Sequence, residues 1–421
     1  MKVFKFGGAS IETVDRARNV AALIREFGNE PLLVVISAKG KTTNALEKVV
    51  DAYCLGNTAD AQQLFADLKN EHIAYAQSLL VSYPQMLSDK IDEIAVEAEW
   101  ILAEAPVRSY DYYYDQLVSI GELLSTLIIE AYLQQEGANS TWMDVRDVMK
   151  TDDTYRDAQV DWALTQKQVD TIFKEAFRKA SIIITQGFIG CTDENATVTL
   201  GREGSDYSAA VFANCLDAES LTIWKDVPSL LNADPKIFPD TVPIPNISFK
   251  EVIEMAYYGA QVIHPKTIKP LQNKDIPLYV KCFLDKNLPG TCISNTREAI
   301  AYPPIMVLKT KQTLLQVSTR DYSFITEDNL SRIYNLFHAC KIKINLIQNA
   351  AISFLACIDT QEDKIAMVLQ ALEQDYEVKR NEDLFLFTVR HYTQHVLDEE
   401  LKNRTVLLEQ RTRQTIQMVV K

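Results

Sequence analysis

The sequence predicts an α/β protein with a mainly parallel sheet, followed by a smaller ferredoxin-like α+β region. Three observations lead to this prediction. Short β-branched apolar runs alternate with helical patterns through the first 300 residues, which is typical of a parallel sheet covered by helices. Residues 56–133 are helical in pattern almost throughout, and the rhythm changes after Pro303 and Pro304. A chain of 421 residues is expected to fold as two or three domains.

The expected buried strands have the length and composition of parallel-sheet strands. They lie near Trp142 and at residues 3–6, 32–37, 181–188, 221–227 and 276–283. Between them, Ser10 is expected to open a helix that stops at Gly28. Two capping boxes are predicted, Asn44 with Glu47 and Ser248 with Glu251. The 56–133 stretch is too long for one crossover helix and is interpreted as a helical insertion.

The C-terminal region reads as β-α-β-β-α-β, the order of a ferredoxin-like unit. The expected elements are strands at 314–319, 342–348, 352–358 and 384–389, with helices at 327–340 and 362–373. They define a first unit of about 312–390. Residues 391–421 are expected to form a second, abbreviated copy, completed by a strand at 305–309.

Composition favours small-molecule partners. The net charge of −14 argues against a nucleic-acid or anionic-membrane surface, because either would require a basic stripe. Seven cysteines without CxxC or Cys/His spacing indicate neither a disulfide framework nor a zinc site. The sequence shows no apolar run of spanning length and starts with a strand pattern, so a cytoplasmic protein is expected.

The first strand leads into a glycine turn that suits phosphate. Lys5 lies on the strand, and Gly7 and Gly8 precede a predicted helix. Backbone N–H groups and the helix dipole favour an anion there, and the lysine adds a mobile charge. The spacing matches neither GxxxxGK[ST] nor GxGxxG, so an ordinary tight turn is the alternative.

Two further loops carry anion-binding groups. Ser37 and Thr43 belong to a small, hydroxylated, doubly basic loop after the second strand, where Thr43 and Asn44 could also serve only as caps. In the second loop, Arg202 precedes Ser205 and Asp206. Ser205 is a predicted N-cap and Asp206 suits a first helical turn, so both could be structural. Arg202 is not needed for capping and can bind a carboxylate with two parallel donors.

Glu122 stands alone in an apolar, hydroxylated helical stretch. A carboxylate there can neutralise a substrate ammonium, although a solvated or lysine-paired surface glutamate is the commoner explanation of such a pattern. His264 before Pro265 is interpreted as an extended turn residue.

Taken together, six motifs resemble the aspartate kinases in order and spacing over about 300 residues. They read KFGGAS, SAKGKTTN, SIGELLST, TVTLGREGSDYSAA, WKDVPSLLNADP and YYGAQVIHPKTI. The resemblance implies a three-layer αβα amino-acid kinase fold at residues 1–300 and paired ACT regulatory domains at 301–421. It also implies transfer of the ATP γ-phosphoryl group to the β-carboxylate of L-aspartate, the step that opens lysine, threonine and methionine synthesis. A monofunctional enzyme is expected.

The resemblance also implies roles for the site residues. Lys5 would stabilise the transferring phosphoryl group above the turn of Gly7 and Gly8, and Asp206 would organise the site. Arg202 would bind the substrate α-carboxylate and Glu122 the α-ammonium. The remaining substrate contacts would be Ser37, Thr43 and Ser205. Mg²⁺ would arrive with ATP, and no protein metal site is expected.

Departures from the family pattern lie around the nucleotide. The expected nucleotide-binding positions after the first strand are Lys225, Asp226, Leu231, Lys236, Gln261 and Val262. Lys225 takes the place of the usual threonine, Leu231 of a tyrosine, Lys236 of an arginine and Gln261 of a lysine. The hypothesis is that Lys225 supplies the cation lost at Gln261. Glu203 occupies a position where the family usually has a glycine. Its side chain is expected to point to solvent or to pair with a nearby lysine.

Regulation is expected at an effector pocket between the ACT regions of two chains. The residues assigned to it are Asp321, Ser323, Phe324, Ile325 and Asn345. The resemblance implies that lysine-inhibited members use an acid in the first ACT unit to bind the effector ammonium. The matching stretch here, residues 343–349, has no acid but neutral amides such as Asn345, and an amide is a poor partner for an ammonium group. We therefore expect weak or absent lysine inhibition and a homodimer formed through the ACT domains.

Two other functions remain compatible with the sequence. One is a different amino-acid kinase, acting on glutamate or acetylglutamate. The other is a catalytically weakened sensor that binds an amino acid through its ACT region. ATP-dependent formation of aspartyl hydroxamate separates the three.

Overall fold

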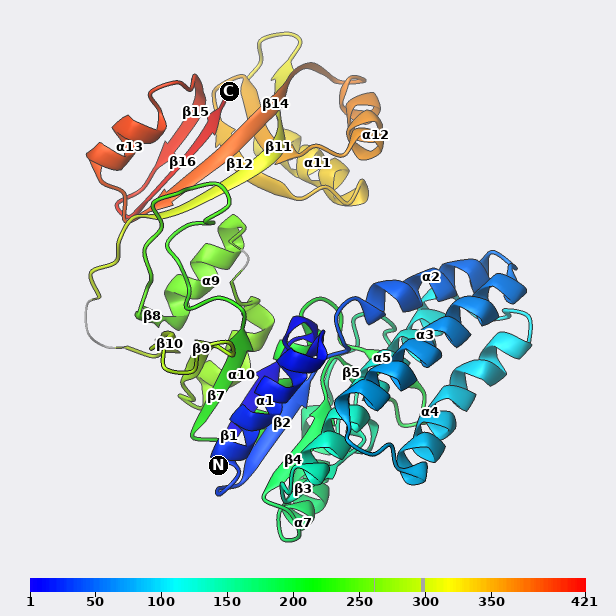
Figure 1. Ribbon diagram of the computed structural model, residues 1–421. Helices are drawn as coiled ribbons and strands as arrows, with labels where there is room; N and C mark the ends of the chain where they lie inside the picture. The colour runs from blue at the N-terminus through cyan, green and yellow to red at the C-terminus, as the bar shows by residue number, and fades with distance from the viewer. Residues whose placement is uncertain (261, 297–299) are drawn as a thin grey trace. The chain divides into compact units, whose positions relative to one another are not determined.

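The computed structural model describes residues 1–260, 262–296 and 300–421. The chain forms two compact units (Figure 1). The first unit consists of Met1–Leu230, Pro245–Val252 and Ile263–Glu298, and the second of Leu231–Ile244, Ile253–Val262 and Ala299–Lys421. Two segments from the range expected for the kinase region therefore cluster with the C-terminal residues. The proposed boundary near residue 300 stays a prediction.

The first unit is built on an eight-stranded sheet in the order β3-β4-β2-β1-β7-β9-β10-β8. The strands are parallel except for the antiparallel pair β9 and β10. Their bounds are β1 Lys2–Phe6, β2 Leu32–Ile36, β3 Ser140–Trp142, β4 Ile182–Gln186, β7 Ser220–Lys225, β8 Asn246–Ser248, β9 Leu278–Cys282 and β10 Thr291–Ser294. All five residues of β2 are buried, as the continuous apolar run predicts. A small separate sheet pairs β5 (Ile189–Cys191) with β6 (Thr197–Thr199).

Helices cover this sheet. The larger ones are α1 Val14–Phe27, α2 Thr42–Cys54, α3 Thr58–Leu79, α4 Gln85–Ala103, α5 Tyr110–Gln135, α8 Gly204–Cys215 and α10 Pro265–Asn273, and the shorter ones are α6 Trp162–Gln168 and α7 Lys174–Ala176. Figure 1 shows α2, α3 and α4 side by side as a helical lobe, and α5 contacts β2, β3 and β4. Helix α8 contacts β1, β2 and β7.

Helix α5 is long and apolar enough by composition to cross a membrane, which the sequence analysis did not expect. In the structure, 89% of its apolar window is buried inside the protein, as in a core helix.

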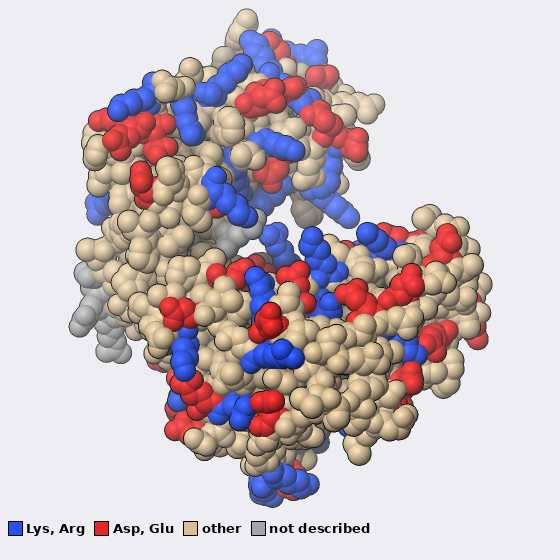
Figure 2. Space-filling view, in the orientation of Figure 1, with Lys and Arg blue, Asp and Glu red and all other residues tan. Residues whose placement is uncertain are grey.

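On the face drawn in Figure 2, basic and acidic side chains are interspersed.

Helix starts differ from the predictions in two places. Residues Gly8–Ile11 form a 3-10 turn, so α1 starts later and its N-cap is Thr13, whose hydroxyl accepts the Arg16 N–H at 3.3 Å. Helix α2 starts at Thr42 without a side-chain cap, so the Asn44 capping box is wrong. Ser248 caps the start of the next helix, α9 (Phe249–Tyr258), as predicted. Its Oγ accepts the Glu251 N–H at 3.1 Å.

The second unit contains a six-stranded antiparallel sheet in the order β12-β13-β11-β14-β16-β15. Its strands are β11 Ile305–Thr319, β12 Ile344–Asn349, β13 Ser353–Asp359, β14 Tyr376–Arg390, β15 Val406–Arg411 and β16 Thr415–Val420. Its helices are α11 Glu327–Ala339, α12 Glu362–Leu372 and α13 Gln394–Glu400. The strands expected at 305–309 and 314–319 are one strand, β11, whose pairing with β14 shifts register between Lys309 and Gln312 and again between Gln312 and Leu314.

Candidate active site

The first unit contains a cavity of about 590 Å³ at the carboxyl ends of its central strands. Gly7 follows β1, Ser37 follows β2 and Asp226 follows β7, so three loops from neighbouring strands meet there. The cavity is lined by Lys5, Gly7, Gly8, Ser37, Thr43, Glu122, Arg202, Glu203, Ser205, Asp206, Lys225 and Asp226, together with Tyr114, Arg156, Phe188 and Thr199. Most of the predicted site residues therefore share one cavity.

Lys5 and Asp206 form the most buried ion pair of the site. Lys5 Nζ lies 2.6 Å from Asp206 Oδ1, and both side chains are largely buried. Lys5 lies on β1, while Asp206 lies in the first turn of α8, where the helix dipole stabilises a carboxylate. The pair holds a cation and an anion at defined places in the wall of the cavity.

Gly8 allows the first two loops to approach each other. A Cβ atom at Gly8 would lie 2.3 Å from the carbonyl oxygen of Ala38, which is far too close. The Gly8 carbonyl also accepts the Gly40 N–H at 3.0 Å. The glycine turn is therefore more than an ordinary bend, because it joins the loop after β1 to the loop after β2.

Glu122 is buried, so its interpretation as a surface glutamate is wrong. The side chain is 3% exposed and lines the cavity. Burial raises the pKa of its carboxyl to about 8, although Lys5 and the Ala38 N–H both favour the ionised form. Oε2 has no hydrogen-bond partner among the residues that the structure describes. A buried acid with an open oxygen in a cavity is suited to a cationic group of a ligand.

The loop before α8 differs from its prediction. Helix α8 begins at Gly204, so Ser205 lies inside the first turn and its role as N-cap is wrong. The N-cap position is held by Glu203 in a left-handed conformation, with φ of 53°. Glu203 is exposed as expected, but its Oε2 accepts the His264 N–H at 3.0 Å instead of binding a lysine. His264 itself is extended, as predicted, and caps α10.

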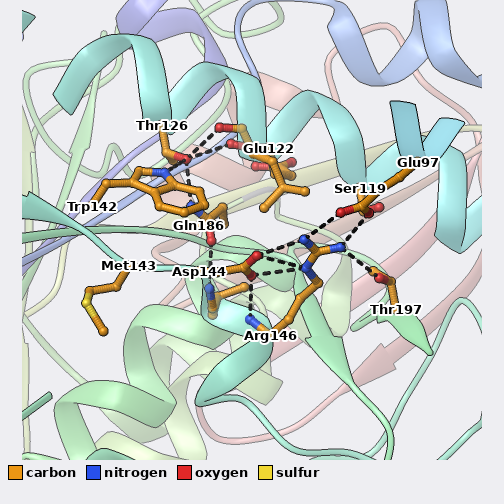
Figure 3. Close-up of polar contacts among 12 residues, drawn as sticks. Glu97, Ser119, Glu122, Thr126, Trp142, Met143, Asp144, Arg146, Gln186 and Thr197 are labelled. Atoms are coloured by element: carbon orange, nitrogen blue, oxygen red, sulfur yellow. Dashed lines mark hydrogen bonds and ion pairs between the residues drawn. The ribbon is translucent and has the colours of Figure 1, made fainter. Parts of the chain in front are cut away.

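Buried polar contacts connect Glu122's helix to the sheet (Figure 3). The Thr126 hydroxyl donates to the Glu122 carbonyl at 2.9 Å and accepts the side-chain N–H groups of Gln186, at 2.7 Å, and Trp142, at 2.9 Å. These contacts join α5 to β3 and β4, so the helix that carries Glu122 is held at a defined depth in the unit.

A second group of contacts holds β6, which leads into the Arg202 loop. Arg146 binds Asp144 at 2.8 Å and Glu97 at 2.8 Å, and it approaches the Thr197 hydroxyl at 3.4 Å (Figure 3). At the end of β6, the buried Asp115 accepts the Thr199 N–H at 2.9 Å and the Thr199 hydroxyl at 2.6 Å. Burial raises the pKa of Asp115 to about 6, against these hydrogen bonds.

Four further residues, Asp115, Arg156, Tyr114 and Thr199, were not predicted from the sequence as site residues. Asp115 and Tyr114 lie in a tyrosine-rich helix start that reads as packing, and Arg156 follows no strand or glycine motif. Only the left-handed backbone of Arg156, with φ of 67°, marks it as unusual, and φ is not visible in the sequence.

Several predicted site residues belong to the second unit. Leu231, Lys236 and Val262 belong to the second unit, and Gln261 lies outside the described residues. The effector candidates also belong to the second unit. There, Asn345 Nδ2 donates to Gln312 and Asp359, both at 2.9 Å, and Asn345 Oδ1 accepts from Lys309 at 2.9 Å. Asp321 Oδ1 accepts the Ser323 N–H at 3.0 Å, Phe324 is 74% exposed, and the Ile325 N–H binds Ala351.

Comparison with known proteins identifies the class of protein. Residues 1–282 match the sequence model of the Amino acid kinase family. The lysine-sensitive aspartokinase 3 of Escherichia coli strain K12 is 32% identical over 362 residues, covering 85% of this chain and 78% of the relative. The chloroplastic aspartokinase 1 of Arabidopsis thaliana is 31% identical, covering 85% of this chain and 63% of that longer relative.

Solved structures agree with these matches. The crystal structure of E. coli aspartokinase III in complex with aspartate and ADP superposes with a TM-score of 0.81 and 27% identity, over 100% of this chain and 96% of the other. The aspartate kinase of Clostridium acetobutylicum has the same fold, with a TM-score of 0.81 at 18% identity. The chain belongs to the amino acid kinase family, on its aspartokinase branch.

Proposed function

We propose that this aspartate kinase transfers the γ-phosphoryl group of ATP to the β-carboxylate of L-aspartate inside the cavity of the first unit. The single observation that supports this site most strongly is the combination of the buried Lys5 and Asp206 pair with the buried, half-unpartnered Glu122 in one cavity. The cavity thus offers a cation for phosphate and a buried carboxyl group that can pair with an α-ammonium group.

Phosphoryl transfer requires alignment and positive charge more than covalent chemistry from the protein. Lys5 is assigned to the transferring phosphoryl group, because it is a buried cation directly before the glycine turn. Asp206 orients the Lys5 ammonium through the 2.6 Å contact. The β-carboxylate is already a nucleophile at neutral pH, so no general base is assigned.

The α-carboxylate and the α-ammonium group of aspartate are each assigned to a cavity side chain of opposite charge. Arg202 binds the α-carboxylate, since its guanidinium provides two parallel donors. Glu122 binds the α-ammonium through the open Oε2. The hydroxyl groups of Ser37, Thr43 and Ser205 line the same cavity and complete the substrate contacts.

The nucleotide phosphates are assigned to the turn of Gly7 and Gly8, with Lys225 and Asp226 at the end of β7. Leu231, Lys236, Gln261 and Val262 remain predicted nucleotide contacts from the family pattern. Among the described residues, no group of three or more His, Cys, Asp or Glu side chains gathers as a metal site. Mg²⁺ is assigned to the nucleotide phosphates, with Asp206 as the nearby carboxylate, where the ion would neutralise phosphate charge.

Hydroxamate formation tests the function. Purified protein with ATP, Mg²⁺ and hydroxylamine is expected to form the hydroxamate from L-aspartate, and not from L-glutamate or N-acetyl-L-glutamate. Lys5→Ala should abolish the signal while the protein stays folded. Preference for either other substrate would identify a different amino-acid kinase, and no product from any of them would favour the sensor.

The family pattern also supports proposals for an effector site, for the oligomeric state and for the location of the protein. A related structure is that of E. coli aspartokinase III with lysine and aspartate. We propose an amino-acid effector site at Asp321, Ser323, Phe324, Ile325 and Asn345, an ACT-mediated homodimer, and a cytoplasmic location. Since the Asn345 amide is already bonded to Lys309, Gln312 and Asp359, lysine below 1 mM should not inhibit. Inhibition in that range would contradict this assignment.

A further inference from the structure

Arg156 is a cation of the cavity wall to which neither the motifs nor the proposed function assigns a role. It lines the cavity together with Tyr114, Thr199 and Arg202. Its backbone is left-handed, with φ of 67°. Residues other than glycine, asparagine and aspartate seldom adopt this conformation.

The backbone at Arg156 is held by a buried carboxylate. Asp115, which is 0% exposed, accepts the Arg156 N–H at 2.9 Å through the same Oδ2 that accepts the Thr199 N–H. One carboxylate thus joins the Arg156 turn to the end of β6. A Cβ atom at Gly201 would lie 3.0 Å from the Arg156 carbonyl oxygen, so the turn packs directly against the loop that carries Arg202.

The Arg156 guanidinium is supported mainly by aromatic faces. Its central carbon lies 4.4 Å from the centroid of the Tyr114 ring and 5.7 Å from that of Tyr110. Tyr114 is fixed in turn by its hydroxyl, which donates to Glu47 at 2.9 Å. The only ionic partner of Arg156 among the described residues is Asp111, at 3.1 Å, and both side chains are about half exposed. Such an exposed pair is weak and is easily exchanged for a ligand carboxylate.

We propose that Arg156 is a second guanidinium for the α-carboxylate of the substrate and acts beside Arg202. Two arginines on packed, adjacent loops at the cavity wall can share the two oxygens of one carboxylate, each as a planar donor. The exchange moves Arg156 from Asp111 to the substrate, with the guanidinium still lying on Tyr114. This inference rests on the proposed function, in which Arg202 binds the same carboxylate.

The test uses Arg156→Gly and Arg156→Asn, because both residues tolerate a left-handed backbone and should leave the thermal midpoint unchanged or raised. Both should raise KM for L-aspartate at least 10-fold, with KM for ATP within 2-fold of the wild type. Arg108→Ala is the matched control. Its guanidinium also lies 4.4 Å from a tyrosine ring centroid, that of Tyr112, but Arg108 does not line the cavity. This variant should leave both constants unchanged.

L-aspartate α-amide identifies the end of the substrate that Arg156 binds. With this neutral analogue, the ratio of kcat/KM between wild type and Arg156→Gly should fall close to 1, whereas with L-aspartate it should be at least 10. An equal ratio for both substrates, an unchanged KM for L-aspartate, or a rise confined to KM for ATP would each overturn the proposal. Absence of wild-type activity with aspartate would instead refute the proposed function.

Discussion

The proposed contact between the buried Glu122 carboxylate and the substrate ammonium predicts that aspartate binding depends on pH. Its pKa is raised to about 8 by burial, and only the ionised form attracts the substrate ammonium. With that pKa, about 3% of the free site is ionised at pH 6.5 and about three quarters at pH 8.5. KM for aspartate should therefore fall about 25-fold between these two values. This pH range lies above the pKa of Asp115, which is about 6, so Asp115 is mainly ionised throughout it.

The assay is ATP-dependent ADP release at constant ionic strength across this range. Glu122→Gln should have a high KM at pH 8.5 and lose the pH dependence, because an amide does not titrate. Glu130→Gln is the control: Glu130 is also buried on α5 and has a raised pKa, but it binds Gln134 and Ser140 and does not line the cavity. A flat KM in the wild type, or the same slope in Glu122→Gln, would refute the reasoning.

The same carboxyl links folding stability to pH. Its pKa is about 8 in the folded protein and near 4.5 when unfolded, so the folded state holds the proton more tightly. This contribution is fully present below pH 4.5 and is lost as the pH rises through 8, at most about 1.4 kcal/mol per pH unit. Urea titrations at pH 6.5 and 8.5 should show a smaller loss of unfolding free energy in Glu122→Gln than in the wild type. Equal losses would contradict a raised pKa.

Three further substitutions test the loops around the cavity. Gly8→Ala places a Cβ 2.3 Å from the Ala38 oxygen, so kcat should fall at least 100-fold with about 1–3 kcal/mol of lost stability. Gly137→Ala, at an open left-handed position, should lose only stability, and full activity in Gly8→Ala would disprove the close-approach argument. Lys225→Ala should lose kcat far more than aspartate affinity, and unchanged kinetics would remove Lys225 from phosphoryl transfer. Glu203→Gly gives up the His264 contact but relieves a left-handed residue, so KM for aspartate should stay equal or fall. A large rise would assign the Glu203 carboxylate to the site.

The sequence by itself predicted most strands of the first unit and most of the residues that line its cavity. Apolar runs of strand length identified β1, β2, β4, β7 and β9, since burial on both faces leaves a continuous apolar pattern. The loops after β1 and β2, and the loop before α8, were found because short motifs contain the residues that phosphate and carboxylate binding require.

Only the tertiary structure decided which groups meet and how they are charged. Asp115 binds Thr199, 84 residues away, and the depth at which Glu122 is buried depends on packing by β3 and β4. The start of α8 at Gly204 follows from the left-handed backbone of Glu203, which also meets His264 from a distant loop. Local patterns specify propensity, whereas desolvation, hydrogen-bond partners and close approaches depend on segments that fold together from far apart in the chain.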